Sequence, residues 1–176
     1  AAAGLPHARQ KRSAGPELGC KVDADHASDT VTRRSRTGFF VYLNCAPIYW
    51  WSKKQTSVEL SSFGSEFIAT KQCCEYLRGL RHKLRMMGIP VVGPTCVYGD
   101  NQSVLANTTI PDSTLKKKSQ SIACHFVCEC AARDEWRTSY VNTNENEADL
   151  LTKQLPAGEN EGVSFAVCFT TFLLHL

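Results

Sequence analysis

Acidic residues stand at four places in the chain where a fold could bring them together. Asp23 and Asp25 lie two residues apart in a run typical of a strand, so both side chains project from one face of it. Glu66 falls early in a predicted helix, Asp100 ends a predicted strand, and Asp149 falls just inside the last predicted helix. Taken singly, each could be a helix cap or a turn residue. Gathered at one place they would repel one another, and a divalent cation would relieve that repulsion.

Carboxylate oxygens of this kind are ligands that suit Mg²⁺ or Mn²⁺. Two such ions, roughly 4 Å apart, stabilise the attacking and leaving oxygens of phosphoryl transfer. Open α/β sheets build their sites beyond the carboxyl ends of strands, which is where Asp100 stands. The acidic residues therefore predict a centre for metal-dependent phosphoryl transfer.

Three strands and a long helix are predicted in the first half of the chain. Aromatic and β-branched runs between turn residues predict strands at 19–25, 38–43 and 48–51. Steps of three, four or seven residues predict one apolar helix face, formed by Phe63, Phe67, Thr70, Cys74, Leu77, Leu84 and Met87. Gly88 and Pro90 predict the end of that helix.

The second half alternates strands and helices. The predicted elements are a strand at 95–98, a strand-to-helix junction at 100–103, a helix at 119–132 and a strand at 136–141. Asn144, with Glu147 three residues later, resembles a capping box that opens a last helix. The order βββ-α-β-α-α-β-α predicts an α/β fold, a five-stranded mixed sheet flanked by helices.

Composition sets the class of protein and its boundaries. The 176 residues suit one domain, and 43% hydrophobic with 21% charged residues is too apolar for a disordered chain. We expect a flexible leader at 1–17, the folded domain at 18–157 and an apolar tail at 158–176. The apolar run 163–176 is interrupted and shorter than the roughly 20 residues of a membrane helix, so no membrane partner is expected. An odd number of nine cysteines without a secretory signal predicts reduced thiols in an intracellular compartment.

Seven sequence blocks occur in one order between about Leu18 and Pro156. They are Val22–Asp25, Arg33–Ser35 followed by Gly38–Phe39, Ala46–Ile48 with Trp50 or Trp51, Ser52–Gln55, Leu60–Ser62 leading to Glu66–Ala69, Asp100–Ser103 and Ala148–Leu155. In this order the chain resembles the ribonuclease H domain of the reverse transcriptase of copia-type LTR retrotransposons. Seven blocks in register are far more specific than a lone short motif.

The resemblance implies a ribonuclease H fold and endonucleolytic cleavage of the RNA strand of RNA–DNA hybrids during reverse transcription. It implies a catalytic tetrad that binds two Mg²⁺ or Mn²⁺ ions, and the matching positions are Asp23, Glu66, Asp100 and Asp149. Strand alternation leaves Asp23 and Asp25 as alternatives; the resemblance favours Asp23, with Asp25 as a supporting neighbour. The implied setting is a longer polyprotein with polymerase and integrase regions, in cytoplasmic virus-like particles or the nucleus.

Basic and amide residues are candidates for binding the hybrid. The predicted nucleic-acid-binding residues are Lys53, Lys54, Asn101, Gln102, Lys116, Lys117 and Lys118. Arg33, Arg34 and Arg36 could add phosphate contacts, and Trp50 or Trp51 could stack on bases. The alternative for these residues is a solvated loop for the charges and core packing for at least one tryptophan.

The chain also departs from the pattern of the family it resembles. His26 stands where the family usually has Trp, 63–65 replace Thr-Glu-Ala before Glu66, Gly99 replaces Cys, and 114–119 replace a His-x-Arg-Thr-Lys-His run. These departures leave an alternative function open, a catalytically impaired remnant of a decayed element that still binds nucleic acid.

Cysteines near the end of the domain offer a further alternative. Cys124, Cys128 and Cys130, with His125, could supply soft ligands to Zn²⁺. Their spacing is not that of a known zinc pair, and the stretch also reads as one helix face. The chain contains no Gly-rich phosphate loop and no Gly-x-Ser-x-Gly elbow, so neither P-loop hydrolysis nor α/β-hydrolase chemistry is predicted.

Overall fold

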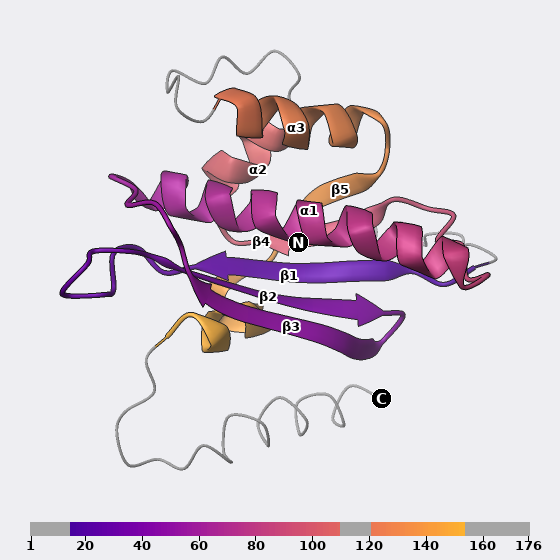
Figure 1. The fold of residues 1–176 in the computed structure, drawn as a ribbon, viewed down its shortest axis with the longest axis horizontal. Helices are drawn as coiled ribbons and strands as arrows, with labels where there is room; N and C mark the ends of the chain where they lie inside the picture. Colours follow the sequence, from indigo (N-terminus) through magenta and orange to yellow (C-terminus); the bar gives the residue numbers. More distant parts are fainter. Residues whose placement is uncertain (1–14, 110–120, 154–176) are drawn as a thin grey trace, which may run out of the picture.

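The computed structural model describes residues 15–109 and 121–153, which form one sheet with helices on it (Figure 1). The strands are β1 Leu18–Ala24, β2 Arg36–Leu43, β3 Ala46–Lys54, β4 Thr95–Gly99 and β5 Trp136–Tyr140. The helices are α1 Ser62–Met86, α2 Gln102–Thr109 and α3 Ser121–Ala132, followed by the 3₁₀ segments η2 Thr143–Glu145 and η3 Glu147–Leu151. The predicted α/β fold with a five-stranded mixed sheet is confirmed.

The sheet has the strand order β3-β2-β1-β4-β5. The first three strands pair antiparallel as a meander, and β4 and β5 add on in parallel to β1. Asp23 of β1 stands opposite Gly38 of β2, which stands opposite Ser52 of β3. The carboxyl ends of β1 and β4 therefore meet at one edge of the sheet, because the two strands run parallel.

Helix α1 covers one face of the sheet and buries most of the apolar stripe that its sequence predicts. Phe67, Cys74 and Leu77 are fully buried there against the central strands. Met87 is an exception: it is 71% exposed and follows the last helical turn, where Gly88 with a φ of +77° ends the helix. The stripe of α1 therefore ends at Leu84.

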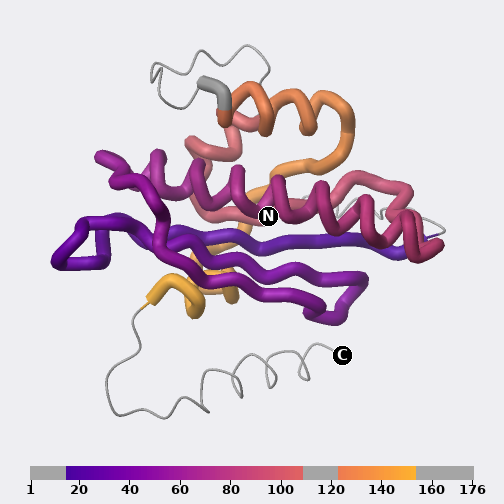
Figure 2. Tube along the Cα trace, viewed as in Figure 1, coloured from indigo at the N-terminus to yellow at the C-terminus, as the bar shows by residue number. Residues whose placement is uncertain are grey.

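The opposite face of the sheet carries η3, and Gly38 makes this contact possible. A Cβ at Gly38 would lie 2.8 Å from Leu151 Cβ, 2.8 Å from Thr152 Cγ2 and 2.9 Å from the carbonyl oxygen of Ala148. Figure 2 follows the chain from α3 through β5 to these 3₁₀ turns on the side away from α1. Glycine at position 38 thus lets η3 lie directly on the strand that pairs with Asp23.

The last helix predicted from the sequence is wrong in type and in its cap. The structure has two short 3₁₀ turns, and η3 is capped by Asn146, whose side chain accepts the Ala148 N–H, while Asn144 lies inside η2. Asn142 caps η2 in the same way. Two asparagines four residues apart each bind the backbone just after them, and this divides the segment into two turns.

Several sequence expectations fall outside the described residues. These are most of the leader, the tail and the lysine run at 116–118. Of the leader, residues 15–17 are described: the Glu17 carbonyl oxygen accepts the Asn44 N–H, and the Glu17 N–H donates to the Asn44 side-chain oxygen. None of the helices in the described ranges is both long and apolar enough to cross a membrane.

Candidate functional site

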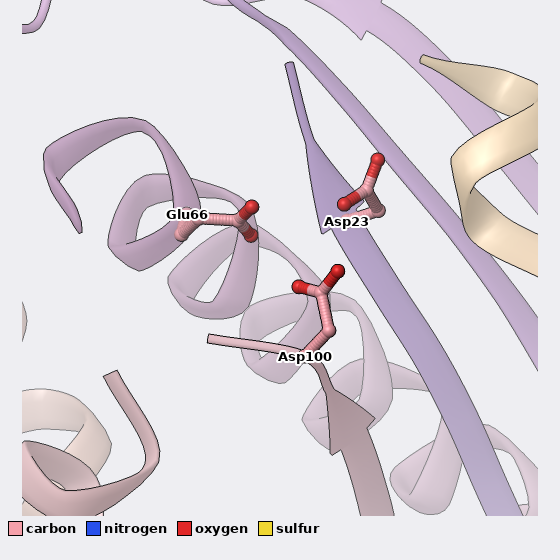
Figure 3. A group of neighbouring side chains, drawn as sticks. All are labelled: Asp23, Glu66 and Asp100. Carbon is pink, nitrogen blue, oxygen red and sulfur yellow. The ribbon is translucent and has the colours of Figure 1, made fainter. Parts of the chain in front are cut away.

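Three carboxylates from three different elements meet at the edge of the sheet where β1 and β4 end. Asp23, Glu66 and Asp100 each offer an oxygen, and these oxygens lie within 4.8 Å of one another. Figure 3 shows the three side chains pointing toward one another, from β1, from the second turn of α1 and from the residue after β4. We call these three residues the acidic centre.

Burial and mutual repulsion disfavour the state of the acidic centre in which all three carboxyl groups are ionised. Burial, together with the charges of Asp23 and Asp100, raises the pKa of Glu66 to about 9. Burial also raises the pKa of Asp23 to about 6, while its hydrogen bond from Thr152 works in the opposite direction. In the described part of the chain no Lys or Arg forms an ion pair with any of the three. The negative charge of the site is therefore not offset by a described side chain, and a bound cation would offset it.

Asp149 lies at the margin of the acidic centre and in a different electrostatic setting. Its charge raises the pKa of both Asp23 and Glu66, so it is close enough to interact with them. It does not belong to the group whose oxygens lie within 4.8 Å of one another. Its carboxylate is ion-paired with Lys153, one helical turn further along the chain. Three of the four predicted carboxylates thus converge. The fourth, Asp149, lies beside them and is ion-paired with Lys153.

Two threonines, not singled out from the sequence, donate hydrogen bonds to carboxylates of the acidic centre. Thr143 Oγ1 donates to Asp100 Oδ2 at 2.8 Å, and Thr152 Oγ1 donates to Asp23 Oδ2. Thr143 is exposed in η2, whereas Thr152 is buried at the end of η3. The only sequence signal for either was the block 148–155, in which Thr152 follows Asp149 by three residues.

The start of α1 is built so that Glu66 faces the strands. Ser61 caps the helix by accepting the Gly64 N–H at 3.3 Å. Gln55, buried just after β3, donates to the carbonyl oxygen of Ser65 at 2.8 Å and to Thr37 Oγ1 at 3.1 Å. The unusual run 63–65 therefore still forms a capped helix tied to the sheet, and it leaves Glu66 in the acidic centre.

Asp25 is separated from Asp23 by its role in the loop after β1. Strand β1 ends at Ala24, one residue earlier than predicted. The Asp25 carboxylate accepts the Arg36 N–H and the Ser28 hydroxyl, so it closes the loop between β1 and β2. Of the two aspartates that alternation left open, the structure places Asp23 among the other acidic residues.

The residues predicted to bind nucleic acid have varied local roles. Lys53 is exposed and its ammonium lies 5.7 Å from the centre of the Trp51 ring, while Lys54 is ion-paired with Asp29. Asn101 caps α2, accepting the N–H groups of Ser103 and Val104. The remaining candidates are Gln102, exposed at the first residue of α2, and Lys116, Lys117 and Lys118, which lie outside the described residues.

The two tryptophans of β3 face opposite sides of the sheet. Trp51 lies in an aromatic cluster with Phe39 and Tyr49 under α1. Trp50 is 50% exposed. Core packing thus accounts for one of the pair, as the sequence suggested for at least one.

The cysteines of α3 do not assemble with other ligands from the part of the chain that the structure describes. Cys124 and Cys128 sulfurs lie 3.8 Å apart, and the Cys128 thiol points to the carbonyl oxygen of Asn107. His125 is exposed on the helix. Within the described residues, the acidic centre is the group of ligands close enough to hold a metal ion, so the zinc alternative gains no support.

The chain is similar to known proteins both in sequence and in fold. No model of a protein family matches the chain. The chain is 30% identical over 146 residues to the retrovirus-related Pol polyprotein from transposon TNT 1-94 of Nicotiana tabacum, a match that covers 83% of the chain and 11% of the polyprotein. It is 32% identical over 133 residues to the Pol polyprotein from transposon RE2 of Arabidopsis thaliana, covering 76% of the chain and 9% of that polyprotein.

A solved structure has the same fold at low sequence identity. The ribonuclease LC11-RNase H1, in its complex with an RNA/DNA hybrid, superimposes with a TM-score of 0.59 at 12% identity, over 77% of the chain and 93% of that protein. The chain spans about a tenth of the length of the two polyproteins it matches. In sequence and fold together, the chain belongs to the ribonuclease H-like domains of retrotransposon Pol polyproteins.

Proposed function

We propose that this domain is a metal-dependent endonuclease that cleaves the RNA strand of RNA–DNA hybrids. The observation that carries the proposal is the acidic centre, in which three carboxylates offer oxygens within 4.8 Å of one another and form no ion pair with a described Lys or Arg. The relationship to Pol polyproteins and the fold shared with a hybrid-binding ribonuclease support the choice of substrate.

The donor set fits a hard divalent cation. Asp23, Glu66 and Asp100 would hold Mg²⁺ or Mn²⁺ through carboxylate oxygens, and Asp149, whose charge acts on Asp23, would contribute to a second site. When bound, such ions activate water and stabilise charge on the phosphate that is cut. No Cys or His of the described ranges joins the centre, and its carboxylate oxygens are ligands for hard cations rather than soft metals.

The chain's own residues prepare this centre for the cation. The raised pKa of Glu66 means that its carboxyl group holds a proton near neutral pH, and cation binding must displace that proton. Thr143 and Thr152 each engage one oxygen of an aspartate and leave its other oxygen for the ion. Lys53 stands exposed at the end of β3, where it could contact the phosphate backbone.

A cleavage assay tests the proposal. The chain is incubated with a hybrid labelled on its RNA strand, with Mg²⁺, with Mn²⁺ and with EDTA, and Asp100→Asn is the matched variant because Asn has nearly the same shape. We expect metal-dependent cleavage that falls by about three orders of magnitude or more in Asp100→Asn. A chain that binds hybrid but cuts it with neither metal would instead be the impaired remnant.

We further propose a copia-type element as the source and a longer polyprotein, acting inside the cell, as the working context. The relatives are Pol polyproteins many times longer than the matched segment. Expression of the chain fused to its upstream region would show whether the neighbouring sequence alters hybrid cleavage.

A further inference from the structure

Thr152 lies between two parts of the site that the fold must hold together. It is the residue after η3 and is 1% exposed. Its hydroxyl oxygen donates to Asp23 Oδ2 and also lies 3.0 Å from the carbonyl oxygen of Asp149. One side chain thus touches a carboxylate of the acidic centre and the backbone of the residue that flanks it.

The single hydroxyl proton of Thr152 goes to Asp23. A threonine hydroxyl has one proton to donate, and a carboxylate is a stronger acceptor than a peptide carbonyl. The Asp149 carbonyl is the ordinary partner of a threonine three residues later, as Thr108 shows by donating to the Leu105 carbonyl at 2.8 Å. The bond to Asp23 is therefore the contact that distinguishes Thr152 from the other buried threonines among the described residues.

The segment that carries Asp149 is attached to β1 at both of its ends. Asn146, which caps η3, donates its side-chain N–H to the carbonyl oxygen of Val22 at 3.0 Å. Thr152, at the other end, donates to Asp23, the next residue of β1. Gly38 provides the space for this segment on the neighbouring strand. Asp149 thus lies between two anchors on consecutive residues of β1.

We propose that Thr152 is a positioning residue of the acidic centre, holding one oxygen of Asp23 and keeping the Asp149 segment against β1, so that affinity for the divalent cation depends on its hydroxyl. This inference rests on the cation binding in the proposed function and not on hybrid cleavage. Partners one layer beyond metal ligands typically change affinity by about 10- to 100-fold when removed.

The hydroxyl and the methyl group of Thr152 make separable contributions. Thr152→Val keeps the branched shape and removes the hydroxyl. Thr152→Ser keeps the hydroxyl and removes the methyl group that lies over Gly38. A positioning role predicts that Val is the damaging substitution, whereas a role in packing alone predicts that Ser is.

The test is titration of the metal-free chain with Mn²⁺ alone by isothermal calorimetry. Thr152→Val should weaken Mn²⁺ binding roughly 10- to 100-fold, and Thr152→Ser should stay within about threefold of the parent. Thr108→Val is the control, because it loses a similar bond to a carbonyl three residues earlier without contact to a carboxylate of the centre. It should bind Mn²⁺ like the parent.

Equal affinity in the parent and Thr152→Val would overturn the inference, as would equal losses in the Ser and Val variants. If Thr152→Val does not fold, Thr152→Ser and Thr152→Ala repeat the comparison, since both lack the methyl group and differ by the hydroxyl. A parent chain that binds Mn²⁺ but does not cut hybrid would overturn the proposed function alone. A parent that does not bind Mn²⁺ would overturn both.

Discussion

The acidic centre and the Asp149 segment are held in place by different means. Asp23 and Asp100 stand at the ends of neighbouring parallel strands, and Glu66 projects from a helix packed across them, so the hydrophobic core sets their positions. Asp149 stands on a 3₁₀ turn whose contacts to the sheet are mainly polar and local, through Asn146, Thr152 and the space above Gly38.

The position of the acidic centre therefore depends on the packing of the whole core, whereas the position of the Asp149 segment depends on a few single residues. Among the described residues, no Lys or Arg forms an ion pair with the three centre residues, whereas Asp149 is ion-paired with Lys153. We therefore expect removal of a centre carboxylate to abolish cation binding. Changes to the Asp149 segment should weaken cation binding only partly.

The largest expected effect comes from comparing Asp23→Asn with Asp149→Asn. Asp23→Asn should lower hybrid cleavage by about three orders of magnitude or more, because a ligand of the centre is lost. Asp149→Asn should lower it by only about 10- to 100-fold, because Lys153 already offsets part of that charge and the centre stays intact. Single-turnover cleavage rates measure both, at one Mg²⁺ concentration that saturates the parent chain. Equal losses would remove the distinction between the two regions.

Gly38→Ala should disturb the Asp149 segment and leave the three centre residues on their elements. The added Cβ would lie 2.8–2.9 Å from atoms of Ala148, Leu151 and Thr152, so η3 must move. We expect a loss of about 1–3 kcal/mol in unfolding free energy and a fall in cleavage similar to that of Asp149→Asn.

Gly79→Ala is the matched control for Gly38→Ala, because nothing lies within 4 Å of its added Cβ on the exposed side of α1. It should stabilise the helix by up to about 1 kcal/mol and leave cleavage unchanged. Thermal unfolding followed by circular dichroism measures the stability of both variants. A Gly38→Ala variant with parental stability and activity would show that η3 does not pack directly against Gly38.

The stability of the metal-free chain should fall as pH rises from about 4 to about 9. Folding raises the pKa of Asp23 to about 6 and that of Glu66 to about 9, so the folded state binds these protons more tightly than the unfolded state. The stabilisation from each proton is complete below the unfolded pKa and is lost as pH rises through the folded pKa. For Asp23 this is on the order of 2–3 kcal/mol.

Denaturant unfolding of the metal-free chain between pH 4 and 9 measures this dependence. In Glu66→Gln the fall above about pH 7 should become shallower, because the group with the higher pKa has gone. Saturating Mg²⁺ should counteract the loss at high pH by binding the ionised carboxylates. A parent that becomes more stable from pH 6 to 9 without metal would contradict the electrostatics of the acidic centre.

The smallest effect is expected at Gly99, which precedes Asp100 in the rigid region. A small cavity lies beside it, lined by Val22, Glu66 and Leu105 among others. A Cβ at Gly99 would make ordinary contacts, 3.7 Å to Val22 Cγ1 and 4.0 Å to Leu105 Cδ2. Gly99→Ala should therefore raise stability by about 0.4–1 kcal/mol with cleavage retained. A destabilised variant in the same unfolding assay would mean that the end of β4 cannot accommodate the added methyl group.

Sequence patterns predicted the region held by the core better than the region held by polar contacts. Aromatic strand runs and the stripe from Phe63 to Leu84 indicated the strands and α1, because burial of apolar side chains dictates both pattern and position. The spacing in β1 left Asp23 and Asp25 equivalent, and it is a loop closed by the Asp25 carboxylate that separates them.

The Asp149 segment was harder to predict, because asparagine caps compete. Asn142, Asn144 and Asn146 all precede an acidic residue or a turn, and the choice of Asn146 follows from its bond to the Val22 carbonyl, a contact 124 residues away in sequence. The threonine hydroxyls of the site depend on such distant partners as well, since Thr152 and Asp23 are 129 residues apart. Local sequence carries no signal for contacts of this range.

Crystals of the chain soaked in Mn²⁺, with anomalous diffraction to locate the ion, test the central claim most directly. The acidic centre predicts an anomalous peak coordinated by Asp23, Glu66 and Asp100, and no such peak in Asp100→Asn crystals grown and soaked in the same way. A parent structure with the three carboxylates converged and no ion among them at millimolar Mn²⁺ would contradict the claim that this is a metal-binding catalytic site.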